Sequence, residues 1–595
     1  MKKSRIIGSL VAIAIACVLC GCGSKNSSQS GEKSFPRDQT LYLAGFIWSP
    51  PSSFNPLNDD PTCPMTGDVF LVYEPMFGYN MMTGELEPIL AKEYSLKDQT
   101  MRVVLQENAQ WHDGTPVTSE DVLYTFELHR KYNTNMHTHW NYIDAMKADG
   151  QNAVVFTLSK KNYNPLIMKE ILATTLILPK KAFKPLEDRC IAEVKAEKKG
   201  VATADDVYEK INAFKNDSTP LASGPYSLYA YSDQKVVLKR VDTYWGNSLH
   251  NGNKPAPLYI VYPIFKSNDA GNLALVQGEV DLSENFIPQI YNRFNQGVGT
   301  WFKEKPYFVP GTIVCLLMGL TKTPFSDVNF RRAISYSVNY EQIRNLAIYG
   351  YAPPLRPGLI LPYGPEKKYY NEEDAARYDV SFDPAKARSI LKDAGYHWGE
   401  DSLLIGPDGK KLNSFFATCP NGWTDWESTM RIIVSGLRAI GVDVREKFVE
   451  EAVWTKDLLN GEFDFTMYQP LDYESAATPW ERFWKTMSSL EWAPPGEVMY
   501  TNMERYKDPV ADSLIDLLPK LKDEAAIQST YRALNTKFMK DLPVVPLMYR
   551  PWNYYEFSNK HWTNFATAEN PYSPPQWLSV GAGIKGLWSI KSTGK

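Results

Sequence analysis

The chain has 595 residues, enough for two to four compact domains. Its 64 Lys and Arg residues stand against 68 Asp and Glu, a net charge of −4, which excludes a nucleic-acid binder that works by neutralising phosphates. Aromatic residues make up 13% of the chain. Most of them are expected in the core, and the surplus is expected to line a binding cleft.

The N-terminus carries a targeting signal. Three basic residues precede an uncharged apolar run from Ile6 to Leu19, which is typical of a signal peptide and too short for a permanent membrane span. The run ends in the letters LCGC, which resemble the lipobox of bacterial lipoproteins. We therefore expect a signal peptide over 1–21, lipidation at Cys22 and a flexible polar tether over 22–34. A soluble secreted protein cut nearby is the alternative.

The next informative stretch pairs a histidine with an acid on a tight turn. Residues 101–105 predict a strand, and Asp113 with the glycine after it predicts the turn that ends it. Thr118 is suited to cap a following helix, and Asp121 stands three residues on, as in a capping box. Each charged residue of the stretch thus has a structural role available, and we interpret it as a corner of the fold, not a catalytic or metal site.

Strands and helices alternate further along the chain. Residues 236–240 predict a strand. Residues 383–391 predict a helix with proline in its first turn and a stop at Gly395, and a second helix is expected from about 427 to 439 with a stop at Gly441. This alternation indicates an α/β protein.

These segments together resemble one family. Residues 111–122, WHDGTPVTSEDV, are similar to the W-x-D-G-x-P-x-T/S-x-x-D-V hallmark of the family 5 solute-binding proteins of bacterial ABC importers, the oligopeptide- and dipeptide-binding type. Six further segments follow in that family's order: Ser223 to Tyr226, Tyr244 to Gly246, Gln277 to Asp281, Phe330 to Tyr336, Asp383 to Tyr396 and Leu542 to Leu547.

The resemblance implies a fold class and a way of working. It implies an α/β, two-lobed periplasmic-binding-protein fold with an enlarged first lobe and a hinge between the lobes. Lobe one is then expected over 35–306 plus 545–595, with an extra subdomain at about 58–219, and lobe two over 307–543. Such proteins hold a ligand in the cleft and close around it, so that ligand and closed state stabilise each other.

The ligand class stays open between two chemistries. In peptide-binding relatives an aspartate pairs with the free amino group of the peptide, and Asp472 with Tyr473 matches that place. The segment appears one residue shorter than in typical oligopeptide binders, and residues 463–468 before it hold no arginine for a terminal carboxylate.

Other segments favour sugars. Residues 478–484 and 561–572 look similar to the branch of the family that binds β-linked oligosaccharides, whose rings stack on aromatic planes. The tryptophans expected as platforms, each in a loop after a strand, are Trp48, Trp423, Trp426 and Trp480. We lean to an oligosaccharide, with an oligopeptide as the other possibility.

The remaining expectations concern partners and alternatives. The resemblance implies a monomer that is lipid-anchored outside the cytoplasm, delivers its ligand to an ABC permease, and has no catalytic residues, cofactor or metal. Cys63, Cys190, Cys315 and Cys419 contain no CxxC pair, and no disulfide is assigned. The alternatives are a secreted glycoside hydrolase that uses Asp472 or Glu481, and a sensor or chaperone with the same fold.

Overall fold

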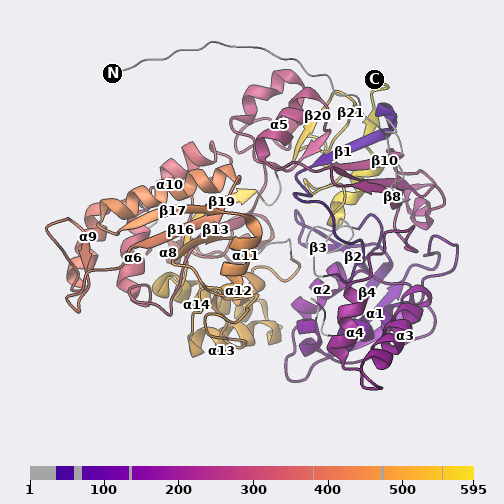
Figure 1. Ribbon diagram of the computed structural model, residues 1–595, viewed down its shortest axis with the longest axis horizontal. Helices are drawn as coiled ribbons and strands as arrows, with labels where there is room; N and C mark the ends of the chain where they lie inside the picture. Colours follow the sequence, from indigo (N-terminus) through magenta and orange to yellow (C-terminus); the bar gives the residue numbers. More distant parts are fainter. Residues whose placement is uncertain are drawn as a thin grey trace, which may run out of the picture. The chain divides into compact units, whose positions relative to one another are not determined.

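The computed structural model describes residues 35–58, 70–132, 134, 137–378, 381–470, 475–551 and 554–595, with the backbone alone at 137–139 (Figure 1). Contacts divide the chain into two compact units, residues 1–36 and 37–595. The second unit contains every sheet and helix that follows. In the part of the chain that is described, no helix combines the length and the apolar character needed to cross a membrane.

A seven-stranded mixed sheet forms the centre of the region that we call lobe one. Its strands stand in the order β12 (Val298–Thr300), β20 (Glu556–Ser558), β11 (Leu282–Ser283), β1 (Thr40–Ala44), β10 (Tyr259–Pro263), β9 (Lys235–Arg240) and β8 (Tyr226–Ser232). Strand β1 runs parallel to β10 and β11, and β20 pairs antiparallel with both β11 and β12. The last segment of the chain therefore completes the sheet that the first segment begins.

A smaller antiparallel sheet follows within residues 58–219. It has the order β4 (Ala91–Lys97), β5 (Thr100–Leu105), β7 (Ala153–Leu158) and β6 (Ile143–Ala148). The hairpin of β2 (Phe77–Asn80) and β3 (Glu85–Pro88) precedes it. Four helices accompany it: α1 (Ser119–Tyr132), α2 (Pro165–Thr174), α3 (Lys180–Glu197) and α4 (Ala204–Asn212).

Lobe two, as we name the second region, is built on a five-stranded sheet. Its order is β17 (Val444–Val449), β16 (Phe415–Pro420), β18 (Phe465–Tyr468), β13 (Pro310–Met318) and β19 (Val545–Pro551). The boundary expected from the sequence assigns β19 to lobe one, whereas its pairing with β13 puts it in the lobe-two sheet. The chain thus returns to the seven-stranded sheet only at β20, because β19 is a buried apolar strand with a ready partner in β13.

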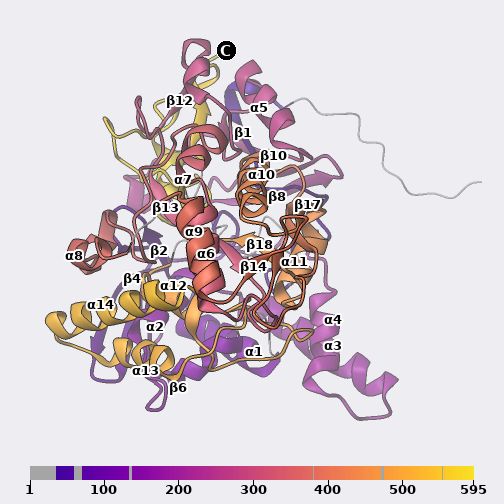
Figure 2. The same cartoon turned by 90° about the vertical axis from the view of Figure 1, so that its left-hand side faces the viewer.

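Helices pack on and around the five-stranded sheet. Helix α10 (Thr424–Ala439) lies against β16 and β17, and α6 (Val328–Ser337) packs on α9 (Pro384–Asp393). Figures 1 and 2 both show α12 (Trp480–Met487), α13 (Pro509–Leu517) and α14 (Glu524–Asp541) side by side. Further elements are α5 (Asn268–Gln277), α7 (Tyr340–Gln342), α8 (Glu372–Ala375), α11 (Glu451–Leu459), the π-helix Ile343–Ala347, the pair β14 (His397–Trp398) and β15 (Leu404–Ile405), and the pair β21 (Trp562–Thr563) and β22 (Lys591–Ser592), besides short 3-10 helices such as Gly364–Tyr369.

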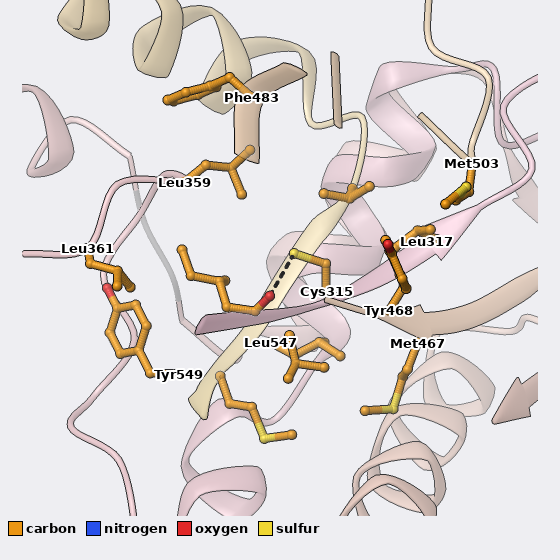
Figure 3. Packing of buried hydrophobic residues seen from close by; sticks show 14 of the residues in the cluster. Cys315, Leu317, Leu359, Leu361, Met467, Tyr468, Phe483, Met503, Leu547 and Tyr549 are labelled. Atoms are coloured by element: carbon orange, nitrogen blue, oxygen red, sulfur yellow. Dashed lines mark hydrogen bonds between the residues drawn. The ribbon is translucent and has the colours of Figure 1, made fainter. Parts of the chain in front are cut away.

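The core of lobe two packs the five-stranded sheet against α12 and against the loop around Leu359. Figure 3 shows Leu317 of β13, Met467 of β18 and Leu547 of β19 in one apolar cluster with Phe483 of α12 and Leu359. All five are buried. This packing fixes the loop around Leu359 and the start of α12, which together form one wall of the cavity described below.

The histidine-aspartate turn is confirmed as a corner of the fold. The backbone N–H of Thr115 donates to Asp113 Oδ1 at 3.1 Å, and that of Thr118 donates to Asp121 Oδ2 at 2.9 Å, which is half of a capping box. His112 Nε2 lies 2.8 Å from the carbonyl oxygen of Gly224, and burial lowers the pKa of this imidazole. His112, Asp113 and Asp121 thus hold the turn and the start of α1.

Candidate ligand-binding cavity

A cavity of about 580 Å³ lies where three distant segments meet. The β2–β3 hairpin contributes Tyr79, residues 302–311 come from the connection between the two large sheets, and residues 344–366 with the start of α12 come from lobe two. Sites for small organic ligands are typically concave and of roughly 300–1,000 Å³. The cavity has the size of such a site, and its walls include residues of both lobes.

Aromatic rings and apolar side chains dominate the walls. Tyr79, Phe302 and Tyr363 line the cavity together with several prolines and aliphatic residues. The Tyr363 ring meets the ring of Tyr549 edge-on, with centroids 5.4 Å apart. Its hydroxyl is buried and has no hydrogen-bond partner among the described residues, and burial raises its pKa well above the ordinary value. Tyr363 therefore keeps its hydroxyl neutral, and this donor is enclosed behind the ring that lines the wall.

A buried ion pair fixes the lobe-two wall. Arg482 Nη1 donates to Glu366 Oε2 at 2.7 Å, and Arg482 Nη2 donates to Glu366 Oε1 at 2.9 Å. The same Nη1 donates to the carbonyl oxygen of Leu359 at 2.7 Å, and the N–H of Leu361 donates to Glu366 at 2.9 Å. A two-pronged pair of this kind sets position as well as charge. It ties the loop from Leu359 to Glu366 onto α12.

The segment around Trp480 lies beside the cavity, but residues other than Trp480 line the wall. Ser475, Thr478 and Arg482 line the wall. Trp480 itself is 3% exposed, stacks on Trp484 with centroids 5.7 Å apart, and donates from Nε1 to the carbonyl oxygen of Ile515 at 2.8 Å. It also lies in a helix, not in the expected loop. Its ring is used in packing α12 on α13.

Two further expected platforms belong to a tryptophan cluster beside β16. Trp426 is 1% exposed and lies within α10, not in a loop, with its ring between those of Trp423 and Trp454. Trp423, at the start of α10, is half-buried and also contacts Trp454. Trp48 is half-buried in the segment after β1. None of these four rings lines the cavity, so their role in binding stays a prediction.

The other expected functional residues lie outside the described part of the chain. These are Asp472, Tyr473 and Cys22. Of the cysteines, Cys190, Cys315 and Cys419 are buried free thiols, and Cys63 is not described. Within the described residues, no group of three or more His, Cys, Asp or Glu side chains has the arrangement of a metal site.

The residues that sequence reasoning missed have a recognisable signal. Residues 350–358, GYAPPLRPG, and 361–366, LPYGPE, are dense in glycine and proline, which marks them as loops. Loops held by a rigid scaffold are where binding residues concentrate. These loops bring Tyr363 and Glu366 to the wall, and the π-helix Ile343–Ala347 just before them brings Arg344.

Comparison with known proteins places the chain in a family. The model of the bacterial extracellular solute-binding proteins, family 5, matches residues 85–488. The probable peptide-binding protein YejA of Agrobacterium fabrum is 23% identical over 539 residues, covering 83% of this chain and 82% of that protein. The periplasmic oligopeptide-binding protein OppA of Escherichia coli is 24% identical over 498 residues, covering 79% and 82%.

Solved structures agree with the two-lobed α/β fold. A periplasmic oligopeptide-binding protein of an oligopeptide ABC transporter from Thermotoga maritima, bound to mannohexaose, superposes with a TM-score of 0.81 at 29% identity, covering 94% of this chain and all of that one. The oligopeptide-binding protein AppA of Bacillus subtilis, in complex with a nonapeptide, gives 0.69 at 18% identity over 93% and 99%, a likeness of fold alone. With more than half of its length matched by the family model, the chain belongs to the bacterial extracellular solute-binding proteins, family 5.

Proposed function

We propose that this chain is the extracytoplasmic substrate-binding lipoprotein of an ABC importer and that it captures a β-linked oligosaccharide in the cavity. An oligopeptide is the other ligand of the same proposal. The protein binds, closes around the ligand and hands it to a membrane permease. It changes no covalent bond of the ligand.

The observation that carries the proposal is the lining of the cavity. The rings of Tyr79, Phe302 and Tyr363 stand among aliphatic and proline side chains, with a few polar groups between them. Sugar rings present apolar faces that pack against aromatic planes, while their hydroxyls need a small number of polar partners. A cavity of this composition suits an oligosaccharide.

The comparisons lend support to the sugar ligand. The Thermotoga maritima protein is described as oligopeptide-binding, yet its structure holds mannohexaose. At 29% identity over its whole length, it is more similar to this chain than the nonapeptide-bound AppA is. We therefore favour the oligosaccharide, although YejA and OppA are described as peptide-binding.

Contacts between the lobes support closure around a ligand. The backbone N–H of Ala476, beside the cavity wall, donates to Glu170 Oε2 of α2 at 2.7 Å. A second contact between the lobes joins α5 to α10, where Asn268 Nδ2 donates to Thr424 Oγ1 at 3.4 Å. A ligand that touches both walls adds to these contacts and shifts the population toward the closed state. The closed state is the form that a permease is expected to recognise.

The proposal is tested by thermal unfolding of residues 32–595 with matched panels of β-linked oligosaccharides and short peptides. A ligand at a hundred times its dissociation constant adds about 2.7 kcal/mol to the free energy of unfolding, which raises the melting temperature measurably. The Tyr79→Leu variant keeps an apolar side chain but loses the flat ring, and we expect at least about tenfold weaker binding.

The matched control is Tyr500→Ala, because Tyr500 is 67% exposed and lies outside the cavity. It is expected to bind as the parent does. A melting temperature that no member of either panel raises would speak against a binding protein for these ligands. Equal binding by parent and Tyr79→Leu would remove the ligand from this cavity.

A further inference from the structure

Two acids lie at the edge of the seven-stranded sheet from which the chain crosses to lobe two. The parallel strands β1 and β11 end side by side at Ala44 and Ser283, and Glu284 directly follows. Glu556 is the first residue of β20 and pairs with Ser283, so it starts at the same edge. The strand before it, β19, ends at Pro551 in the lobe-two sheet. Both acids thus stand where one lobe passes into the other.

Glu556 is enclosed without a hydrogen bond to its carboxyl group. Its side chain is fully buried, and neither carboxyl oxygen has a hydrogen-bond partner among the described residues. A charged carboxylate is strongly disfavoured in such surroundings and takes up a proton instead. Loss of solvation accordingly raises the pKa of Glu556 well above its ordinary value, although Arg550 lies near enough to oppose this.

The cation that faces the two acids belongs to lobe two and is already paired. Arg550 of β19 donates from Nε to Asp425 Oδ2 of α10 at 2.9 Å, and this ion pair is buried. Because Asp425 balances Arg550, the acids of lobe one have no counter-charge of their own. Glu284 is half-buried, and loss of solvation raises its pKa well above the ordinary value, with the nearby Glu556 adding to the rise.

The other elements around β20 do not supply a charge that would hold either acid ionised. Strands β11 and β12 contain no charged residue, and Asp269, the one charged residue of α5, is exposed. The phenols of Tyr351 and Tyr554 also lie near Glu556, and burial raises the pKa of each, so both are neutral. The interface therefore fits acids that carry protons.

Groups of lobe two cover this cluster when the lobes are together. The Tyr351 hydroxyl donates to the carbonyl oxygen of Ile287 at 2.6 Å and accepts from the N–H of Ile290 at 2.6 Å. The Tyr554 hydroxyl donates to Asp425 Oδ2 at 3.1 Å, and its ring lies 6.4 Å from that of Tyr351. Separation of the lobes breaks such contacts and is expected to let water reach the acids, which then ionise as ordinary glutamates do.

We propose that closure of the lobes takes up protons on Glu556 and Glu284, so that acidity favours the closed state. The inference rests on the proposed closure around a ligand, and it does not depend on the class of that ligand. Above pH 4.5, where a solvated glutamate is ionised, the closed state binds more protons than the open state. Raising the pH from there shifts the population toward the open state, by up to about tenfold per pH unit for each acid.

Small-angle X-ray scattering of ligand-free residues 32–595 tests the inference without a ligand. We expect the radius of gyration of the parent to grow as the pH is raised from about 5.5 to about 8.5. Glutamine imitates a protonated glutamate, so Glu556→Gln and Glu284→Gln are each expected to weaken this dependence, and the double variant is expected to stay compact throughout.

The matched control is Glu74→Gln, which removes a buried acid whose donors, Tyr244 and Trp245, both belong to lobe one. It is expected to keep the pH dependence of the parent radius. Melting temperatures check that each variant is folded. Calorimetric titration with a neutral β-linked hexasaccharide, in two buffers of different ionisation heat, adds the number of protons taken up on binding, which we expect to fall in the double variant.

The outcomes separate the inference from the function on which it rests. A parent radius that does not change with pH, or that changes equally in the double variant, overturns the inference. Binding of the hexasaccharide without proton uptake overturns it as well and leaves the binding function standing. A pH-dependent radius that the double variant abolishes supports the inference even when the oligosaccharide and peptide panels are silent, and the proposed ligands are then wrong.

Discussion

Glu74 is a buried acid held by neutral donors. It is fully buried, the Tyr244 hydroxyl donates to its Oε1 at 2.6 Å, and Trp245 Nε1 donates to its Oε2 at 3.2 Å. Loss of solvation outweighs these bonds and raises the pKa of Glu74 from 4.5 to about 8. The folded protein therefore keeps a proton on this group that the unfolded chain releases at much lower pH.

This proton makes stability fall as pH rises. Between pH 4.5 and 8 the folded state binds more protons than the unfolded state, so the free energy of unfolding decreases by up to about 1.4 kcal/mol per pH unit. Glu74→Gln imitates the protonated side chain. We expect the variant to match the parent near pH 5 and to be more stable than the parent at pH 8, as measured by urea unfolding at four pH values.

The comparison isolates Glu74 because the other contributions are common to both proteins. Buried Glu504 has its pKa raised to about 8 by the same loss of solvation. It therefore lowers the free energy of unfolding of parent and variant alike as pH rises. The difference between parent and variant cancels that decrease. Parallel curves for the two proteins would show that Glu74 is ionised in the folded state.

At the scale of the element, α12 separates a packing face from a binding face. Trp480 donates to the carbonyl oxygen of Ile515 in α13, while Arg482 of α12 and Thr478, which precedes the helix, line the cavity. Trp480→Ala is expected to cost about 3–5 kcal/mol of stability, because it removes a large buried ring. Thr478→Val removes the hydrogen bond that Thr478 Oγ1 donates to the carbonyl oxygen of Ser475 at 2.9 Å, so we expect a loss of about 0.5–1.5 kcal/mol in the free energy of unfolding together with altered ligand affinity.

Urea unfolding and titration of the two variants check this division. If Trp480 is a sugar platform, Trp480→Phe lowers affinity with little loss of stability. If it is a packing residue, Trp480→Phe retains affinity and Trp480→Ala unfolds at lower urea.

The local elements were largely predictable from sequence, whereas the directions in which individual side chains point were not. Asp383 caps α9 through a bond from the N–H of Lys386 at 2.9 Å, as its position before a proline indicates. Helix α10 begins at Thr424, three residues before the expected start. No serine or aspartate stands at the cap position to mark this start in the sequence. Instead, the N–H of Gly422 donates to the side chain of Glu427. Caps and turns are encoded within a few residues. The face that Trp480 presents depends on α13, which lies far along the chain.

At the scale of the whole molecule, the proposed lipidation of Cys22 sets where the protein is expected to reside. With Cys22 lipidated, the full chain is expected to partition into the detergent phase of a phase-separating detergent, and Cys22→Ser should move it to the aqueous phase, since the described residues supply no membrane-crossing helix. Ligand affinity of the two forms should agree. Detergent-phase partitioning of Cys22→Ser would place the membrane anchor elsewhere in the chain.

The cavity itself could not be predicted from sequence because its walls come from segments that are distant in the sequence, with more than two hundred residues between Tyr79 and Phe302. Tertiary structure, not local sequence, brings these two residues to the same cavity as Tyr363. Family resemblance implied two lobes and a cleft. It did not indicate which loops would supply the wall. Residues in binding loops are suited to a particular ligand, whereas the residues of the corner at Trp111 are needed for the fold.

The order of strands also sets when the chain can finish folding. Strand β19 completes the lobe-two sheet, β20 joins β11 to β12, and Trp562 donates to the carbonyl oxygen of Thr40 near the opposite end of the sequence. A nascent chain that lacks its last residues therefore leaves open edges in both sheets at once. Domains usually mature in order as they emerge during synthesis. We therefore expect both sheets to stay incomplete until the residues of β19 and β20 have been synthesised.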